Sequence, residues 1–303
     1  MQIKTISKII KTKLNSWLNS ITDEELKKEL KDNILVSGGS ITSLFLNEPV
    51  NDYDIYVKTT DLAEKIAKYY SKNYPEIKVF RGDHKEKYYQ DTELHKEINP
   101  FSSGVTGSFF RNLKPDQVKL WFNKEIGYKT EHKDEGLEKY IPLYFSPNAI
   151  SLSDKVQIVL RFTGNNEQIH KTFDFVHATN YFTFEEGLVT NKKALESILT
   201  KQLLYQGSFY PLTSIIRTKK FIKRHWNINA GEYLKIMFQI SNLNLTNVDV
   251  LEDQLVGVDV AYFQLLINIL RKKVEKEPNW VPTYEYIFTI IDKVFQETEN
   301  ELE

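Results

Sequence analysis

The chain has 303 residues, of which 41% are hydrophobic and 27% charged, with no cysteine and a formal net charge of −1 at pH 7. This composition predicts a soluble globular protein of one large or two ordinary domains. It excludes disulfides and thiolate metal sites, and it argues against a broadly basic surface for nucleic acids. Neither a membrane-spanning apolar stretch nor the start of a signal peptide is present, so we expect a cytoplasmic protein.

Residues 2–19 predict an amphipathic helix, because large apolar side chains recur at helical spacing and lysines occupy the remaining positions. A lysine-rich helix of this kind can lie on a membrane, but stable membrane binding takes a second signal, which we do not find. We therefore expect the helix to pack on its own domain and expect no membrane partner. Thr22 and Glu25 form a capping-box pattern that begins a second, short helix.

The next segment predicts a turn that can bind phosphate. An apolar run over 34–36 predicts a strand, which ends at Gly38, Gly39 and Ser40, and a short helix over about 40–47 follows. Glycines let a backbone approach a phosphate closely, and a serine at a helix start adds a hydroxyl donor. We therefore expect these three residues to bind a nucleotide.

A second predicted strand carries Asp52 and Asp54, one residue apart. Side chains at positions i and i+2 of a strand lie on the same face, so the two carboxylates point the same way. Adjacent carboxylates repel one another unless a cation lies between them. Mg²⁺ is the natural cation, since it usually binds through one or two carboxylates together with substrate phosphates.

The middle of the chain predicts less regular structure. Residues 61–71 have the pattern of a helix and residues 77–80 that of a strand. Residues 99–147 are rich in aromatic residues, glycine and proline, with a helix expected near 115–124. We interpret residues 81–150, approximately, as an irregular insertion into the first domain that can act as a lid.

Two further strands are predicted over 156–162 and 170–176, the second containing Asp174. Beyond them, apolar residues recur with the helical period of 3.6 residues. The sequence therefore predicts an α+β fold in two domains. A mixed β-sheet with helices occupies residues 1–190, and an all-helical domain occupies residues 191–303.

The Gly-Gly-Ser turn followed by Asp-x-Asp resembles the head of the polymerase-β-like nucleotidyltransferase superfamily. The resemblance implies that Asp52 and Asp54 bind Mg²⁺, as two ions, with Mn²⁺ as an alternative. A third carboxylate on a neighbouring strand completes the site in that superfamily, and Asp174 is the downstream acidic residue inside a clear strand pattern. The resemblance thus implies that all three aspartates are metal ligands and catalytic residues, with Asp174 helping to activate the attacking hydroxyl.

A narrower resemblance points to bacterial-type tRNA nucleotidyltransferases and poly(A) polymerases. The matching positions in the head are Gly38, Gly39, Leu44, Leu46, Pro49, Asp52 and Asp54. Where that family has an Arg-Asp pair, this chain has Thr42 and Ser43. Its base-reading Glu-Asp-x-x-Arg element has a counterpart at Glu252 and Asp253, but without the arginine, and its Arg-Arg-Asp-Phe element lacks both arginines.

The same family has a Pro-Leu…Arg-x-x-Arg-Phe-x-x-Arg helix, to which residues 211–224 are similar. On a helical wheel Arg217, Lys220 and Arg224 share one face with Phe221. Cations around an exposed ring suit a triphosphate, a stacked base or an RNA strand, and we expect these four residues to bind nucleotide. A solvated basic face with one stray aromatic ring is the alternative. The opposite, apolar face would hold Leu212, Ile215, Ile222 and Trp226.

These patterns predict a magnesium-dependent nucleotidyltransferase that moves an NMP from an NTP such as ATP to an acceptor hydroxyl and releases pyrophosphate. The resemblance favours the 3′ end of an RNA such as tRNA as the acceptor. Transfer to a small molecule or a protein is the alternative within the enzyme class. A nucleotide-binding scaffold without catalysis is the alternative outside it. The oligomeric state is left open by the sequence.

Overall fold

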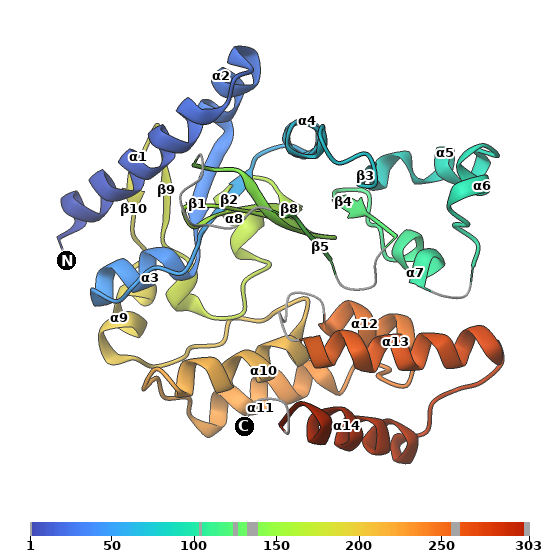
Figure 1. Cartoon of the computed structure of the whole chain (residues 1–303). Helices are drawn as coiled ribbons and strands as arrows, with labels where there is room; N and C mark the ends of the chain where they lie inside the picture. The colour runs from blue at the N-terminus through green and yellow to red at the C-terminus, as the bar shows by residue number, and fades with distance from the viewer. Residues whose placement is uncertain (1, 103–104, 124–126, 132–138, 256–260, 300–303) are drawn as a thin grey trace.

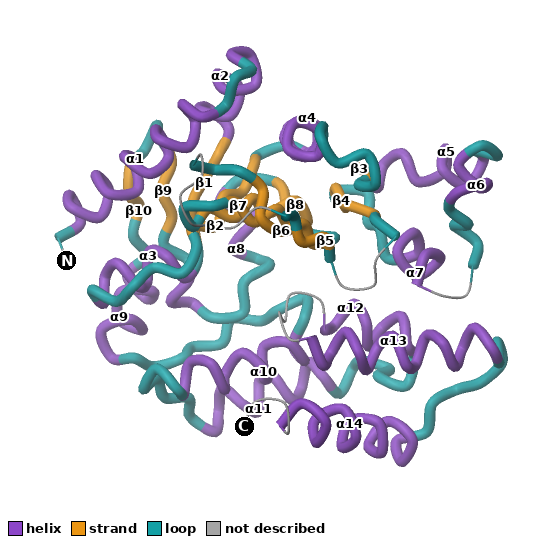
Figure 2. Tube along the Cα trace, viewed as in Figure 1, coloured by secondary structure: helices purple, strands orange, loops and turns teal. Residues whose placement is uncertain are grey.

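A mixed sheet lies at the centre of the N-terminal part of the computed structural model, which describes residues 2–102, 105–123, 127–131, 139–255 and 261–299. Its strands are β1 (Ile34–Ser37), β2 (Tyr53–Val57), β5 (Tyr128–Lys129), β6 (Pro142–Ser146), β7 (Ala149–Leu152), β8 (Val156–Thr163), β9 (Tyr181–Thr183) and β10 (Gly187–Val189). Their order is β10-β9-β1-β2-β8-β7-β6-β5. β2 and β8 run parallel, whereas β1 pairs antiparallel with both β2 and β9. Figure 2 shows the strands gathered between layers of helices.

One face of this sheet is covered by α1 (Ile3–Ser20), α2 (Glu24–Asn33) and α4 (Thr60–Ser71), as Figure 1 shows. The apolar stripe of α1 is buried in the main core, so this helix packs on its own fold as expected. Asp23, rather than Thr22, caps α2, accepting a hydrogen bond from the Leu26 amide at 3.0 Å. Among the described residues, no helix has the length and apolar character needed to cross a membrane.

The other face of the sheet looks toward the C-terminal helices (Figure 1). These are α9 (Lys192–Thr200), α10 (Pro211–Ile222), α11 (Ala230–Ile240), α12 (Val248–Leu255), α13 (Ala261–Lys276) and α14 (Tyr284–Glu299). A small apolar cluster on this face contains Leu35, Tyr56, Ile169 and Tyr181. The predicted fold class, a mixed sheet with helices followed by a helical part, is confirmed.

A smaller two-stranded sheet stands beside the main one. It pairs β3 (Lys78–Arg81) with β4 (Val118–Trp121), and the helices α5 (Lys85–Gln90), α6 (Leu94–Glu97) and α7 (Val105–Arg111) lie between these strands in sequence. The helix expected near 115–124 is therefore wrong, because residues 118–121 satisfy their backbone groups against β3. Within the predicted insertion, β5, β6 and β7 belong to the main sheet, so its outlying part is residues 78–121.

The strand expected over 170–176 is also wrong. A capping box, in which Asn165 and Gln168 bond each other's backbone amides, begins the short helix α8 (Asn166–His170). An irregular segment follows and leads into a 3-10 helix, Val176–Ala178. Asp174 consequently lies on a bend between two helical turns and outside the sheet.

Candidate active site

Gly38 forms the turn between β1 and α3 (Gly39–Leu46). Its φ of +94° lies in the region that residues with a Cβ rarely adopt, which explains the glycine. Its amide donates to the Ala178 carbonyl at 3.1 Å, so the segment after Asp174 holds the turn in place. A Cβ built at Gly38 would lie 3.4 Å from Asp54 Oδ2. The glycine turn and this carboxylate therefore face each other, although they belong to different elements of the chain.

Gly39 and Ser40 form the first turn of α3, where backbone amides have no partner within the helix. A Cβ at Gly39 would meet none of the described atoms within 4 Å, so the backbone borders open space. Ser40 is buried, and its Oγ has no hydrogen-bond partner among the described residues. A buried hydroxyl without a partner is costly. A phosphate oxygen bound at this helix start would supply the missing acceptor.

The alternation along β2 decides which side chains join the site. Tyr53, Ile55 and Val57 enter the main core, so Asp54 and Tyr56 point to the opposite face, toward the C-terminal helices. Asp52 lies one residue before the strand and is exposed. The sequence analysis missed Tyr56, although the same alternation from Asp54 would have found it.

The pKa of the Tyr56 hydroxyl depends on the charged side chains around it. Burial raises the pKa of its hydroxyl well above the usual value, and the carboxylates of Asp54 and Asp174 raise this pKa further, while Arg217 lowers it. All three charged side chains thus lie within electrostatic reach of one buried phenol. Its ring contacts that of Phe173, with centroids 5.9 Å apart, which ties β2 to the segment that carries Asp174.

Asp174 is buried, and hydrogen bonds engage both of its carboxylate oxygens. Oδ1 accepts from the Phe175 amide at 3.0 Å, and Oδ2 pairs with Nη1 of Arg217 on α10, also at 3.0 Å. Burial alone would lower the pKa of Arg217, but Asp174, Tyr56 and Asp54 raise it. An arginine from the C-terminal helices is therefore the cation that accompanies the acidic residues in this structure.

The described residues contain no group of three or more histidine, cysteine or acidic side chains placed to hold a metal ion. The prediction that Asp52, Asp54 and Asp174 converge as three metal ligands is therefore wrong, because Arg217 holds the outer oxygen of Asp174. The remaining pair, Asp52 and Asp54, fits Mg²⁺ of the kind that takes one or two carboxylates and completes its shell with phosphates and water. The Ser40 hydroxyl and the open turn at Gly39 fit that phosphate.

The four residues predicted on one face of α10 do not act together. Arg217 contacts Asp174, whereas Arg224 pairs with Glu48 and donates to Ser43 Oγ at 3.3 Å. Burial would raise the pKa of Glu48, but the hydrogen bonds from Arg224 and Lys201 outweigh burial and lower it. The Arg224 guanidinium therefore fastens the turn after α10 to Ser43 of α3 and to Glu48 just beyond that helix.

Lys220 and Phe221 also have different surroundings. The lysine is exposed, but the phenylalanine packs against the rings of Phe175, His177 and Trp226. The expectation of an exposed ring for base stacking is therefore wrong. The helical wheel failed because α10 ends at Ile222, and Trp226 returns to the side of Phe221. Ile222, predicted on the apolar face, has 49% of its surface exposed.

Two histidines stabilise the glycine turn from behind. The Ser37 hydroxyl lies 3.0 Å from His170 Nε2 and 2.8 Å from the Asn180 carbonyl. The same hydroxyl lies 3.2 Å from the Ala178 carbonyl. The His177 carbonyl accepts from Thr42 Oγ1 at 3.0 Å. Burial lowers the pKa of both rings to about 4, so both are neutral at pH 7.

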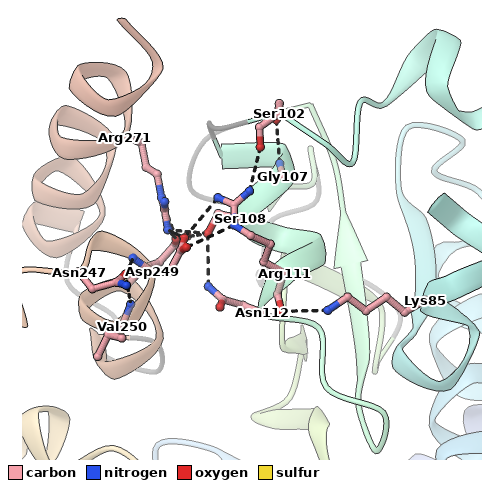
Figure 3. A network of polar contacts seen from close by, with 11 residues as sticks. Lys85, Ser102, Gly107, Ser108, Arg111, Asn112, Asn247, Asp249, Val250 and Arg271 are labelled. Atoms are coloured by element: carbon pink, nitrogen blue, oxygen red, sulfur yellow. Dashed lines mark hydrogen bonds and ion pairs between the residues drawn. The ribbon is translucent and has the colours of Figure 1, made fainter. Parts of the chain in front are cut away.

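A second polar cluster joins the outlying part of the insertion to the C-terminal helices, and we call Ser108, Arg111, Asp249, Glu252 and Arg271 the polar clasp. Figure 3 shows Ser108 and Arg111 of α7 facing Asp249 and Arg271. Arg271 donates to Ser108 Oγ at 2.7 Å and to Glu252 through Nε at 3.1 Å, and it also pairs with Asp249. Burial would raise the pKa of Asp249, but Arg111 and Arg271 lower it.

The acidic pair at 252–253 is likewise engaged by arginines from other elements. Glu252 belongs to the clasp, and Asp253 accepts from Arg161 Nη2 of β8 at 2.7 Å. The Arg161 guanidinium lies 4.2 Å from the centre of the Tyr210 ring, at the start of α10. Contacts between arginines and carboxylates thus join the C-terminal helices to α7, to β8 and to the segment that carries Asp174, and Arg217–Asp174 is the one at the candidate active site.

Comparison with known proteins gives one family match. The sequence pattern described as "Gabija anti-defense 2 family protein" matches residues 8–201, more than half of the chain. A curated relative, "Gabija anti-defense 2" of Bacillus phage SPbetaL7, is 25% identical over 252 residues, which cover 82% of this chain and 46% of the relative. The chain thus spans about half the length of that relative.

Among solved structures, the chain is similar to CCA-adding enzymes, the branch that the sequence motifs resemble. The Thermotoga maritima CCA-adding enzyme complexed with tRNA is 12% identical, with a TM-score of 0.38, and the match covers 89% of this chain and 57% of that one. A CCA-adding enzyme with ATP is 12% identical, with a TM-score of 0.40, and the match covers 92% and 55%. Likeness at this level is remote and carries no functional conclusion.

Proposed function

This chain belongs to the Gabija anti-defense 2 family, and from that premise we propose that it counters the Gabija defence by metal-dependent nucleotidyl transfer. In this reaction an acceptor hydroxyl attacks the α-phosphate of an NTP, a new oxygen–phosphorus bond forms, and the bond to pyrophosphate breaks. The name of the phage relative supports the anti-defence role, and the geometry around Gly38 supports the chemistry.

One observation carries the proposal. The glycine turn, with a φ of +94° at Gly38, faces the Asp54 carboxylate. A Cβ built at Gly38 would lie 3.4 Å from Asp54 Oδ2. A backbone that approaches closely, a buried Ser40 hydroxyl in need of a partner and adjacent carboxylates together suit the two parts of a metal–triphosphate complex. A solvated surface strand would require none of these features.

The roles of the residues follow from their positions. The amides of Gly39 and Ser40, beside the turn that Gly38 forms, would bind phosphate oxygens, and the carboxylates of Asp52 and Asp54 would hold the magnesium. When bound, the metal would supply charge neutralisation on the phosphates and a lowered pKa of the acceptor hydroxyl. Arg217, which is half-exposed beside Asp174, would contact the triphosphate from the side of the C-terminal helices.

The acceptor remains a matter of proposal. A 3′ hydroxyl of RNA is the first candidate, from the motif resemblance, and Lys220 is an exposed cation of α10 that would contact its phosphates. Arg224 and Phe221 are engaged within the fold, which weakens the case for RNA. A hydroxyl on a protein or small molecule of the defence is the second candidate, and nucleotide binding without transfer is the third.

Release of pyrophosphate from a mixed NTP pool tests the proposal. We expect release with Mg²⁺ or Mn²⁺, none in EDTA and none from Asp54→Asn. Labelled-nucleotide transfer to RNA, to protein and to small molecules then identifies the acceptor. Saturable nucleotide binding with no pyrophosphate under any of these conditions would contradict transfer and support the binding role.

A further inference from the structure

The candidate active site contains its own cation. Arg217 Nη1 lies 3.0 Å from Asp174 Oδ2, and burial would lower the pKa of the guanidinium, but the carboxylates of Asp174 and Asp54 raise it. Asp54 in turn faces the Gly38 turn. This ion pair lies on the same side of β2 as the carboxylate that would hold a metal, because Tyr56 shares the face of Asp54 and its ring contacts Phe173, next to Asp174.

Exposure separates this arginine from a structural one. The Arg217 side chain is 41% exposed, whereas the side chain of its partner Asp174 is 9% exposed. The aspartate is fixed by the Phe175 amide as well as by the ion pair, but the arginine side chain is partly exposed and can meet a ligand that arrives from solvent. A phosphate offers such a guanidinium charge-assisted hydrogen bonds of the same kind as the carboxylate does.

We propose that Arg217 is a resident counter-ion that competes with a divalent cation for the acidic site, so that tight metal binding depends on an anionic ligand engaging the guanidinium. A metal ion near Asp54 is repelled by this arginine. When a triphosphate engages the arginine, its negative charge removes that repulsion, and metal and nucleotide favour each other's binding. By linkage, the factor by which each ligand strengthens the other is the same.

This inference rests on the proposed function, because it concerns the same metal and nucleotide. It adds a regulatory consequence. The free cation alone would bind weakly, which keeps the site inactive until metal and nucleotide arrive together. Arg217 would thus have opposite effects on the two ligands, opposing the metal and favouring the nucleotide.

The two effects can be measured separately. Mn²⁺ alone is titrated into the full chain and the free ion is followed by its paramagnetic resonance signal. NTP binding is measured in EDTA, without any metal. For Arg217→Gln we expect Mn²⁺ affinity to rise about tenfold, as removal of a nearby partly solvated charge predicts. We expect metal-free NTP affinity of this variant to fall about tenfold.

Two variants serve as controls. Arg217→Lys keeps the charge and should retain the Mn²⁺ affinity of the original chain. Arg224→Gln removes the same kind of charge from the turn after α10, but its guanidinium pairs with Glu48, so Mn²⁺ affinity should again be unchanged. Equal Mn²⁺ affinity in Arg217→Gln and the original chain would overturn the inference while leaving metal-dependent transfer intact.

Loss of Arg217 leaves the buried Asp174 unpaired, which can unfold the protein. Asp174→Asn and the double variant Asp174→Asn/Arg217→Gln avoid this, because neither strands a buried charge. The double variant should bind Mn²⁺ about tenfold more tightly than the single one. No difference between them would contradict the inference. Failure of every folded variant to bind Mn²⁺ would instead reject the proposed metal site itself.

Discussion

Arginines meet carboxylates both in the polar clasp and at the candidate active site, and these two places differ in burial. In the polar clasp the central arginine, Arg271, has 2% of its side chain exposed and contacts Ser108, Asp249 and Glu252. At the candidate active site the Arg217 side chain is 41% exposed and pairs with Asp174. The comparison teaches that the same chemical pair can fix a structure when it is enclosed and can exchange ligands when one member borders solvent.

The largest expected effect comes from a substitution at the candidate active site, which should lower the rate of nucleotide transfer and leave stability unchanged. Asp54→Asn should lower nucleotide transfer by at least about a thousandfold, because metal binding contributes several kcal/mol to the transition state. The fold should persist, since Asp54 is only partly buried and lies beside another carboxylate. Pyrophosphate release and the urea midpoint check the two statements.

Asp116→Asn is the matched control for this change. Asp116 is an exposed aspartate on the turn before β4, away from the glycine turn. Its replacement should leave transfer and stability as they are. Normal transfer by Asp54→Asn would remove the carboxylate from the mechanism and end the metal-dependent proposal.

Substitutions in the polar clasp should change the stability of the protein and not its chemistry. Arg271→Met removes one partner of a buried network and should lower the free energy of unfolding by about 3–5 kcal/mol. Arg111→Met, in the same network but with 37% of its side chain exposed, should cost less than about 1 kcal/mol. Urea denaturation measures both. Equal losses would mean that burial does not distinguish the two arginines, and the comparison above would fail.

The sequence predicted the parts of the site that are close together in the chain. The turn at Gly38 follows from a strand, two glycines and a helix start, and the outward direction of Asp54 follows from alternation along β2. The position of Asp174 could also have been improved, since Asn165 and Gln168 carry a capping-box signal that starts a helix where a strand was expected.

The remaining features depend on how distant elements dock, which local patterns do not encode. The Arg217–Asp174 pair joins residues 43 positions apart, and nothing near either residue specifies the partner. The same holds for Arg224 with Glu48, which turned a predicted nucleotide contact into a contact between the segments that follow α10 and α3. Phe221 lies within α10, and its ring packs against Phe175 and His177, which are distant in the sequence.

Lowering the pH should destabilise the active-site region before it destabilises the polar clasp. Burial lowers the pKa of His177 from 6.5 to about 4, so the folded state favours the neutral ring. Between pH 6.5 and 4 the unfolded chain binds more protons than the folded one, and the free energy of unfolding therefore falls as the pH decreases through this window. The loss is at most about 3 kcal/mol for this ring. His170 has a pKa lowered in the same direction and adds to it.

Hydrogen exchange at pH 7 and pH 5 locates the effect. Protection should fall in residues 174–180, which carry His177 and hold the glycine turn, and should persist in α12 and α13. His177→Phe removes the titrating group from its aromatic surroundings and should flatten the pH dependence of stability. His225→Gln, exposed beyond the end of α10, is the control and should not change the profile. Equal loss of protection in both regions would contradict a local origin.

The smallest expected effect concerns the acceptor. Lys220 is exposed on α10, the helix that carries Arg217, and a single solvated cation contributes about twofold to fivefold to the affinity for a phosphate. If the acceptor is an RNA that passes along α10, Lys220→Ala should weaken RNA binding by that factor. It should also reduce the slope of log affinity against log salt by about 0.7, the value for one contact with a single strand. Lys28→Ala, on α2 and across the sheet from α10, supplies the same loss of charge away from the cleft and should change neither quantity. Because nucleotide binding and RNA binding are measured separately, identical behaviour of the two lysine variants toward RNA would leave the metal and nucleotide site intact. It would exclude a path for RNA along α10 and make a small-molecule or protein hydroxyl the leading acceptor.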